Sequence, residues 1–224
     1  MKVSVIDYGL SNLLSVCRAV EKLGHEPSLI RTGPEVREAN ILILPGVGAF
    51  SDGMAGLIAR DMLEPLWGCA ESNVPILGIC LGMQMLFESS REYGIHRGLG
   101  LIPGHVERIC ERSMDDTPLR IPHIGWAGLL APESTSENFT SPLLRYVQPG
   151  EEVYFVHSYA AQPKHREHIL SECSYGGNRL CAAVGRKNIY GTQFHPEKSG
   201  PVGLKILQAF LQSARESSGS PSLV

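Results

Sequence analysis

Short apolar runs alternate with longer segments whose apolar positions recur at helical spacing through the first half of the chain. The runs at 41–44 and 75–79 are almost free of polar residues, which is typical of strands covered by helices on both faces. The same pattern predicts further strands at 3–7 and 27–30, and helices at 11–23, 54–69 and 81–90. This alternation of strands and helices predicts a mainly parallel sheet with helices on both faces.

Polar and small residues mark the expected helix ends. Ser11 is placed to cap the first helix, and Gly24 suits the position just past its end. Pro65 marks a break within the helix expected at 54–69, because proline cannot continue the backbone hydrogen bonding of a helix interior.

The second half of the chain is richer in strand-like segments. We expect strands at 106–110, 121–126, 152–157, 169–173, 180–184 and 189–194, with a tight turn at Lys187 and Asn188. A helix at 201–215 follows, and residues 216–224 are small and polar, as in a disordered tail. The predicted fold class is α/β. It has one domain over 1–215, built on an open, mainly parallel sheet flanked by helices, with an antiparallel strand region in the second half.

The composition narrows the function classes. The 224 residues carry a formal charge of −3, which argues against a protein that follows nucleic-acid phosphates. The longest apolar stretch, 74–87, contains Pro75 and Gln84 and is shorter than the roughly 18 residues that a membrane helix needs. The first residues do not resemble a signal peptide. We therefore expect a cytoplasmic protein with no membrane or nucleic-acid partner.

The six cysteines fall at irregular spacings without a C-x-x-C pair, which predicts reduced thiols rather than disulfides. Five of them are interpreted as small packing residues: Cys17, Cys69, Cys110, Cys173 and Cys181. The sixth, Cys80, lies in a different context.

Cys80 is the centre of a G-x-C-x-G pattern between an expected strand and an expected helix. This is the sulfur version of a nucleophile elbow, a sharp turn that needs small residues such as Gly78 and Gly82 around the nucleophile. Such a turn exposes its side chain at the carboxyl end of the sheet, where open α/β proteins place their sites. The alternative interpretation of Cys80 is a buried structural thiol.

A cysteine nucleophile needs a base, and the base needs an acceptor that orients it. His195 and Glu197 flank Pro196 at the end of the last expected strand. Residues two apart in an extended segment point the same way, so Glu197 can accept from one imidazole nitrogen while the other faces Cys80. The alternative is a His-Pro-Glu turn on the surface.

A glycine-containing loop follows the strand expected at 41–44, and it comprises Gly46, Val47 and Gly48. Its backbone amides can turn toward a developing oxyanion, with the amide of Leu81 as the second donor. Taken by itself, this segment is more simply interpreted as an ordinary loop. The three elements together predict a catalytic site, because each follows a strand of the expected sheet.

Three motifs resemble those of the class I, or triad, glutamine amidotransferases: Pro45–Phe50, Gly78–Gln84 and Phe194–Ser199. Within that class the chain is similar to the glutaminase subunits of imidazole glycerol phosphate synthases in histidine biosynthesis. Similar segments in that group are Ile6–Leu13, Pro122–Trp126 and Tyr154–Tyr159. Met83 and Lys198 also match this group, whereas relatives that serve other synthases more often carry histidine at the first position and lack the lysine. The resemblance extends over about residues 1–211.

The resemblance implies that Cys80 attacks the side-chain amide of glutamine, releases ammonia and forms a glutamyl thioester. His195 would protonate the ammonia and then activate water, while Glu197 holds His195. The loop at Gly46–Gly48 would stabilise the oxyanion after a rearrangement. A further set would grip the amino and carboxylate groups of glutamine: Gln84, Glu92, Ser158 and Tyr159. No cofactor or metal is expected, and the sequence has no phosphate-binding G-x-x-x-x-G-K-[S/T] loop.

The resemblance also implies a heterodimer with a (β/α)8 cyclase. That partner would use the ammonia to make imidazole glycerol phosphate and an aminoimidazole carboxamide ribotide (AICAR). A second barrel of ~250 residues does not fit in this chain, so the cyclase is expected to be separate. His123 and Trp126 lie in the segment that is expected to face the cyclase. The alternative interpretation is that these two residues serve local packing. Ala127 stands where the family usually has asparagine, which leaves open a paralogous subunit that supplies another synthase.

Two other function classes stay open on sequence grounds. One is another cysteine hydrolase on the same scaffold, such as a peptidase or γ-glutamyl hydrolase. It is disfavoured by Met83, Gln84 and Lys198 and by the Tyr154–Tyr159 segment. The other is a catalytically silent partner protein, which is disfavoured because Cys80, His195 and Glu197 are all present.

Overall fold

The computed structural model describes residues 1–10, 12–132 and 138–219. Within them, the central sheet has seven strands in the order β11-β12-β13-β4-β3-β1-β2. Their bounds are β1 Lys2–Ile6, β2 Glu26–Ile30, β3 Leu42–Gly46, β4 Ile76–Cys80, β11 Ile169–Tyr175, β12 Asn178–Arg186 and β13 Ile189–Thr192. The strands from β2 across to β13 are parallel, whereas β12 pairs antiparallel with β13 and with β11. The expected open, mainly parallel sheet is confirmed.

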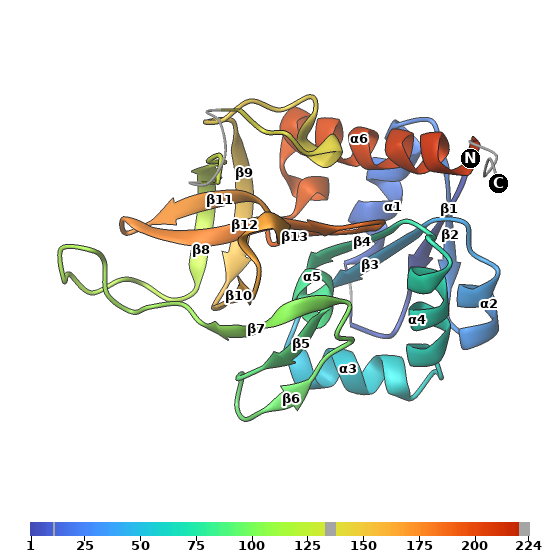
Figure 1. The fold of residues 1–224 in the computed structure, drawn as a ribbon, viewed down its shortest axis with the longest axis horizontal. Helices are drawn as coiled ribbons and strands as arrows, with labels where there is room; N and C mark the ends of the chain where they lie inside the picture. The colour runs from blue at the N-terminus through green and yellow to red at the C-terminus, as the bar shows by residue number, and fades with distance from the viewer. Residues whose placement is uncertain (11, 133–137, 220–224) are drawn as a thin grey trace.

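Helices cover both faces of this sheet (Figure 1). One face carries α1 (Leu13–Lys22) and α6 (Gly200–Gly219), and the other carries α3 (Phe50–Ile58), α4 (Leu63–Glu71) and α5 (Leu81–Met85), with α2 (Gly33–Arg37) against α4. Alternate residues of the buried strands face opposite layers. Ile43 and Leu77 belong to the apolar cluster that includes α1 and α6. Leu42 and Ile76 belong to the cluster of α3 and α4. Burial on both faces explains why these strands are continuous apolar runs.

Two smaller sheets supply the strand-rich second half. One has the order β10-β7-β5-β6, formed by β5 Phe87–Ser90, β6 His96–Arg97, β7 Ile102–Arg108 and β10 Tyr159–Pro163. The other is the antiparallel pair of β8 (His123–Gly128) and β9 (Glu152–His157). Figure 1 shows β8, β9 and β10 beyond the end of β4 that leads into α5, where β11 and β12 of the central sheet also extend. Short 3-10 helices lie at Pro142–Leu144, Arg166–His168 and Pro196–Lys198.

The helix expected at 81–90 is wrong in its second half. α5 ends at Met85, and Phe87 begins a strand that pairs in parallel with Ile102 of β7. Phe87 and Ser90 are buried while Glu88 is exposed. The strand is held in place by its pairing with β7, which the local sequence does not reveal. The apolar residues before it therefore favoured a continuing helix.

The helix break expected at Pro65 lies elsewhere. The segment forms two helices, α3 and α4, separated at 59–62. Pro65 lies in the first turn of α4, where backbone N–H groups have no partner within the helix, so the missing donor costs nothing. α3 begins at Phe50, earlier than the expected start at 54.

Other element ends differ in smaller ways. The short elements α2, β6 and β10 were not predicted, and α6 continues to Gly219, past its expected end. Gly24 follows α1 with φ +78, as expected, whereas the cap predicted at Ser11 lies outside the described residues. Of the disordered tail expected at 216–224, residues 216–219 belong to α6, and residues 220–224 lie outside the described residues, where the tail stays a prediction. Among the helices in the described ranges, none has the length and apolar character needed to cross a bilayer.

Candidate active site

Cys80 is the last residue of β4 and immediately precedes α5. Its φ of +54° and ψ of −107° lie outside the regions that non-glycine residues ordinarily occupy, a strain on the order of 1–3 kcal/mol. Gly78 and Gly82 make this turn possible. A Cβ at Gly82 would overlap the carbonyl oxygen of Leu44, and one at Gly78 would lie 2.7 Å from the backbone of Gly82. The G-x-C-x-G pattern therefore reflects close backbone contacts on both sides of the cysteine.

Cys80 lies next to the glycine-containing loop because of the sheet register. β3 and β4 are parallel neighbours, and Gly46 pairs directly with Cys80. On the other side of β4, β13 runs parallel, with Thr192 opposite Ile79. The chain leaving β13 therefore brings His195 to the same end of the sheet.

His195 and Glu197 form a buried pair. His195 Nδ1 lies 2.7 Å from Glu197 Oε1, and both side chains are 1% exposed. A carboxylate accepts, so Nδ1 donates and Nε2 is the nitrogen left for the site. Within the part of the chain that the structure describes, Nε2 makes no hydrogen bond. Burial acts to lower the pKa of His195, but interactions with Cys80 and Glu197 outweigh it and raise that pKa to about 9.

Cys80 and His195 line one cavity of about 290 Å³. The cavity is lined by Val47, Gly48, Cys80, Leu81, Gln84, Glu92, Pro122, Val156, His157, Ser158, Tyr159 and His195. Nine of these were predicted as site residues from the sequence. The other four predicted residues, Gly46, Glu197, His123 and Trp126, lie outside the lining. This volume is close to the lower end of the range for small-molecule pockets, which suits a ligand of amino-acid size.

The loop after β3 does not direct all its amides into the cavity. Val47 N–H donates to the carbonyl oxygen of Leu10 at 3.2 Å, and Gly48 follows with φ +111°. Gly46 is buried in β3, where a Cβ would overlap the hydroxyl of Tyr8. The Tyr8 hydroxyl is itself buried and makes no hydrogen bond with the described residues. Burial, followed by the nearby charge of Cys80, raises the pKa of Tyr8.

Two of the predicted substrate-binding side chains already hold backbone groups. Glu92 Oε2 accepts from the N–H of Phe50 at 2.6 Å, at the start of α3. Gln84 Nε2 donates to the carbonyl oxygen of Tyr159 and to Gln193 Oε1, both at 3.0 Å. Gln193 in turn donates from Nε2 to Cys80 Sγ at 3.7 Å.

Sequence reasoning gave no role to Gln193, although it stands two residues before His195. The same extended-chain argument that placed Glu197 beside His195 could have directed attention to it. The sequence also offered no reason to expect the buried hydroxyl of Tyr8 beside Gly46, because a tyrosine after an N-terminal strand carries no recognisable pattern.

The β8–β9 pair has a buried side and an exposed side. His123 is 3% exposed and stacks between Phe155 and Tyr175, with ring centroids 5.0 and 4.2 Å away. Trp126 is 53% exposed and contacts Tyr154 edge to face. Trp126 is therefore accessible on the surface, whereas His123 is packed beneath it.

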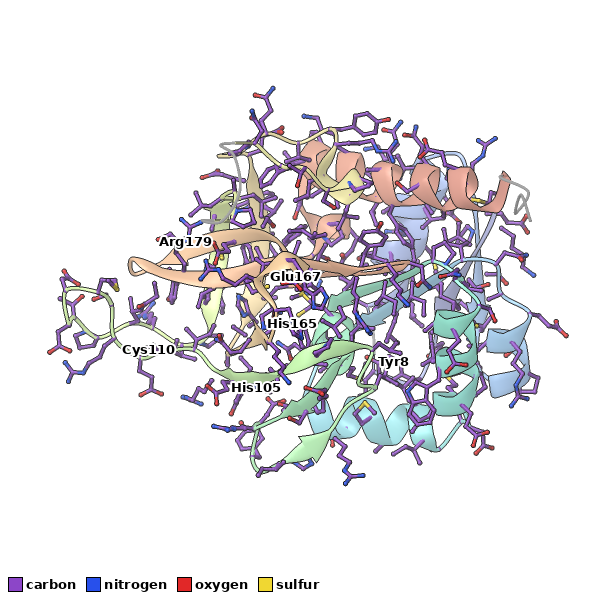
Figure 2. The ribbon with its side chains drawn as sticks, viewed as in Figure 1. Tyr8, His105, Cys110, His165, Glu167 and Arg179 are labelled. Carbon is purple, nitrogen blue, oxygen red and sulfur yellow. The ribbon has the colours of Figure 1, made fainter. Side chains whose placement is uncertain are left out.

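The remaining cysteines are free thiols with different surroundings. Burial raises the pKa of Cys69, Cys173 and Cys181, which suits packing residues. Cys110 is exposed, so its interpretation as a packing residue is wrong. It follows β7 on the segment that leaves the body of the protein, well away from Tyr8 (Figure 2). Among the residues in the described ranges, no group of three His, Cys, Asp or Glu is arranged to hold a metal ion.

Comparison with known proteins identifies the relatives of this chain. The family model of class-I glutamine amidotransferases matches residues 4–214. Imidazole glycerol phosphate synthase subunit HisH 1 of Legionella pneumophila (strain Lens) is 46% identical over 210 residues, covering 94% of this chain and 98% of that protein. Subunit HisH of the imidazole glycerol phosphate synthase from Geobacter sulfurreducens is 43% identical over 210 residues, covering 93% of this chain and 97% of that protein.

Solved structures share the fold at low identity. PurLQS from Thermotoga maritima superposes with a TM-score of 0.69 at 22% identity, over 95% of this chain and 98% of that one. A crystal structure of a glutamine amidotransferase gives a TM-score of 0.71 at 17% identity, over 95% of this chain and 99% of that chain. With nearly the whole length matched by the family model, and with relatives above 40% identity, this chain belongs to the class-I glutamine amidotransferase family.

Proposed function

We propose that this chain is the glutaminase subunit of an imidazole glycerol phosphate synthase, with Cys80, His195 and Glu197 as its catalytic residues. The observation that carries the proposal is the shared cavity. It places a strained, elbow-mounted thiol beside a histidine whose other nitrogen is held by a buried carboxylate. The similarity to two synthase subunits over 93–94% of the chain supports the choice of synthase.

In the first half-reaction, the Cys80 thiolate forms a bond to the side-chain carbonyl carbon of glutamine. His195, protonated at neutral pH because its pKa is about 9, gives its proton to the amide nitrogen as the carbon–nitrogen bond breaks. Ammonia leaves and a glutamyl thioester remains. In the second half, neutral His195 takes a proton from water, which attacks the thioester and releases glutamate and the thiolate. Glu197 stabilises the charged imidazole each time it forms.

The negative oxygen that forms in both steps needs donors. Leu81 lines the cavity next to Cys80, and its amide is one donor in this proposal. The second comes from the Gly46–Gly48 loop. Val47 N–H donates to the carbonyl oxygen of Leu10, so the proposal requires this hydrogen bond to break before the amide can serve as a donor. Gly48, already at φ +111°, has the conformational freedom such a rearrangement needs.

The rest of the cavity supplies recognition of glutamine. The Glu92 carboxylate suits the α-ammonium group, and Gln84, Ser158 and Tyr159 complete the wall that holds the amino-acid end. Glu92 is positioned by its hydrogen bond to Phe50 N–H. A site of this size and polarity favours free glutamine over a peptide substrate, which would need an open groove.

The partner in this proposal is a (β/α)8 cyclase bound at the exposed side of β8. Ile124 and Trp126 are 58% and 53% exposed there, on the strand that pairs with β9, and β9 leads into the cavity wall. Ammonia released at Cys80 would pass to the cyclase, which makes imidazole glycerol phosphate and AICAR. Ala127, where the family usually has asparagine, supports one alternative: a paralogous subunit with another synthase as its partner.

A glutaminase assay with and without a purified histidine-pathway cyclase tests the proposal. We expect weak activity alone, strong stimulation by the cyclase with its ribonucleotide ligand bound, and loss of activity in Cys80→Ala. Cys110→Ala, at an exposed thiol, is the matched control and should retain activity. Turnover in Cys80→Ala would overturn the role of Cys80. Equal activity without any partner would overturn the coupling, and stimulation only by a different synthase would identify the paralogue.

A further inference from the structure

The carbonyl oxygen of Tyr159 is the fixed point of a buried hydrogen-bond chain. It accepts from His157 Nδ1 at 2.8 Å and from Gln84 Nε2 at 3.0 Å. A backbone carbonyl can only accept, so both nitrogen atoms must carry the hydrogen. The orientation of the Gln84 amide is therefore set by the main chain.

The orientation of Gln84 sets that of Gln193. Gln84 Nε2 lies 3.0 Å from the side chain of Gln193, and a donor there requires the oxygen of Gln193 to face it. The NH2 group of Gln193 must then point the other way, toward Cys80 Sγ at 3.7 Å. Gln193 is 0% exposed, so reversing its amide would leave buried polar atoms facing like atoms.

The backbone of Gln193 is equally constrained. Its N–H donates to the carbonyl oxygen of Ala182 at 2.8 Å, which ties it to β12. His195 follows two residues later, so one short segment delivers both an amide donor and an imidazole to the thiol. The donor at Cys80 is thus built into the fold and does not depend on a mobile side chain.

Two titratable groups, His195 and Tyr8, interact electrostatically with Cys80. Two uncharged polar neighbours of Cys80 Sγ favour opposite protonation states of the sulfur. The carbonyl oxygen of Val156, 3.9 Å away, can accept only from the neutral thiol. The NH2 group of Gln193 is a donor and favours the negatively charged sulfur. Deprotonation therefore weakens the contact with Val156 and strengthens the one with Gln193.

We propose that Gln193 is a further catalytic residue, whose side-chain amide donates to Cys80 Sγ and stabilises the thiolate, with Gln84 as the residue that orients it. This rests on the proposed role of Cys80 as nucleophile. In addition to any contact with glutamine, Gln84 then has a positioning role at the reacting sulfur.

The test measures the reactivity of Cys80 directly, without glutamine or a partner. The full chain is treated with iodoacetamide from pH 5 to pH 10, and alkylation of each cysteine is followed by mass spectrometry of its peptide. Gln193→Met keeps the length of the side chain but removes the donor, and Gln193→Glu places a carboxylate beside the sulfur. Exposed Cys110 is an internal control whose profile should be the same in every variant. Gln208→Met, on the exposed side of α6, is the matched substitution control.

For Gln193→Met, we expect the pH of half-maximal Cys80 alkylation to rise and the rate below it to fall about tenfold, as for the loss of one hydrogen bond to a charged group. Gln193→Glu should raise the pH of half-maximal Cys80 alkylation still further. An unchanged Cys80 profile in a folded Gln193→Met would overturn the proposal. A merely structural role would lower the melting temperature without moving the profile.

A second measurement needs no substitution at Gln193. In the ¹⁵N-labelled wild-type chain, the Gln193 side-chain amide resonance should shift with pH at the same midpoint as Cys80 alkylation. This shift should be lost in Cys80→Ala. A resonance that does not respond to pH in the wild type would overturn the proposal even if Gln193→Met does not fold. Glutaminase activity is not used in either experiment, so failure here is distinguishable from failure of the proposed function.

Discussion

His123 and His157 face each other across the β8–β9 pair, with His123 Nδ1 3.3 Å from His157 Nε2. Because His157 Nδ1 donates to the carbonyl of Tyr159, its Nε2 must accept, so His123 is the donor. Both rings are neutral in this arrangement. The pair connects the strand that carries exposed Trp126 to the segment that forms the wall of the cavity.

Acid should destabilise the fold through His157. Burial is the main cause that lowers its pKa to about 4, with nearby His123 and His195 acting in the same direction. The unfolded chain, with a histidine pKa near 6.5, therefore binds more protons between pH 6.5 and 4, and stability falls by up to roughly 3 kcal/mol across that window. Urea unfolding at pH 7, 6 and 5 measures this decline in the free energy of unfolding. His157→Gln should show a shallower decline than wild type, and exposed His165→Gln should not.

Removing the carboxylate from the His195–Glu197 pair should reduce activity and shift its pH dependence. Glu197→Gln keeps the shape but loses the charge, so the pKa of His195 should fall from about 9. His195 is then less often protonated when ammonia must leave, and its orientation is less well held. We expect partner-stimulated glutaminase activity to fall by about 100-fold or more. A rate within a few-fold of wild type would contradict the role of Glu197.

The same pair makes a contribution to stability on the alkaline side. The pKa of His195 is raised above its unfolded value, so its stabilising effect is complete below about pH 6.5 and is lost as the pH rises through about 9. Unfolding measured between pH 7 and 10 should therefore show a smaller alkaline loss in Glu197→Gln than in wild type. Equal losses in the two proteins would contradict this coupling.

The elbow should not tolerate a methyl group. In Gly82→Ala the new Cβ would overlap the carbonyl oxygen of Leu44, so β3 or the elbow must move. We expect a loss of about 1–3 kcal/mol in the free energy of unfolding, together with reduced Cys80 alkylation. Gly68→Ala in α4 is the matched control, since nothing lies within 4 Å of its added Cβ. It should stabilise the chain by about 0.5–1 kcal/mol. Similar stability changes in the two variants would contradict the packing argument.

Partner binding should depend on the exposed side of β8. Trp126→Ala removes a large ring that is half exposed and makes an edge contact with Tyr154. We expect affinity for the cyclase, measured by isothermal titration calorimetry, to fall at least about tenfold, with little change in melting temperature. Ile95→Ala is the control, because Ile95 is 83% exposed but lies between β5 and β6. Equal losses for both variants would mean that the partner binds elsewhere.

The sequence predicted which candidate site residues lie together better than it predicted the elements around them. Cys80, His195 and Glu197 carry their chemistry in local patterns, and the parallel sheet brings the ends of β4 and β13 together. Gly46 beside Cys80 follows from the same rule. These relationships depend on strand order and direction, which continuous apolar runs and their spacing indicate.

The features that sequence reasoning missed depend on contacts between distant residues. β5 exists because Phe87 pairs with β7, and nothing local distinguishes it from the end of a helix. The donor role of Gln193 depends on a carbonyl at Tyr159, which reaches it through Gln84. The burial of His123 depends on the rings of Phe155 and Tyr175. Exposed Cys110 could not be told from a packing thiol, since a cysteine is compatible with either position.

The pairing of Gly46 with Cys80 has a consequence for how the nucleophile and the loop are held relative to each other. Adjacent strands lie about 4.8 Å apart, so the sulfur and the loop that follows Gly46 start from positions separated by one strand spacing. That spacing is a constant of β structure, not a product of side-chain choice. The starting separation between the nucleophile and the loop is therefore set by main-chain pairing at this end of the sheet. Substitutions of the side chains around the two strands leave this starting separation the same.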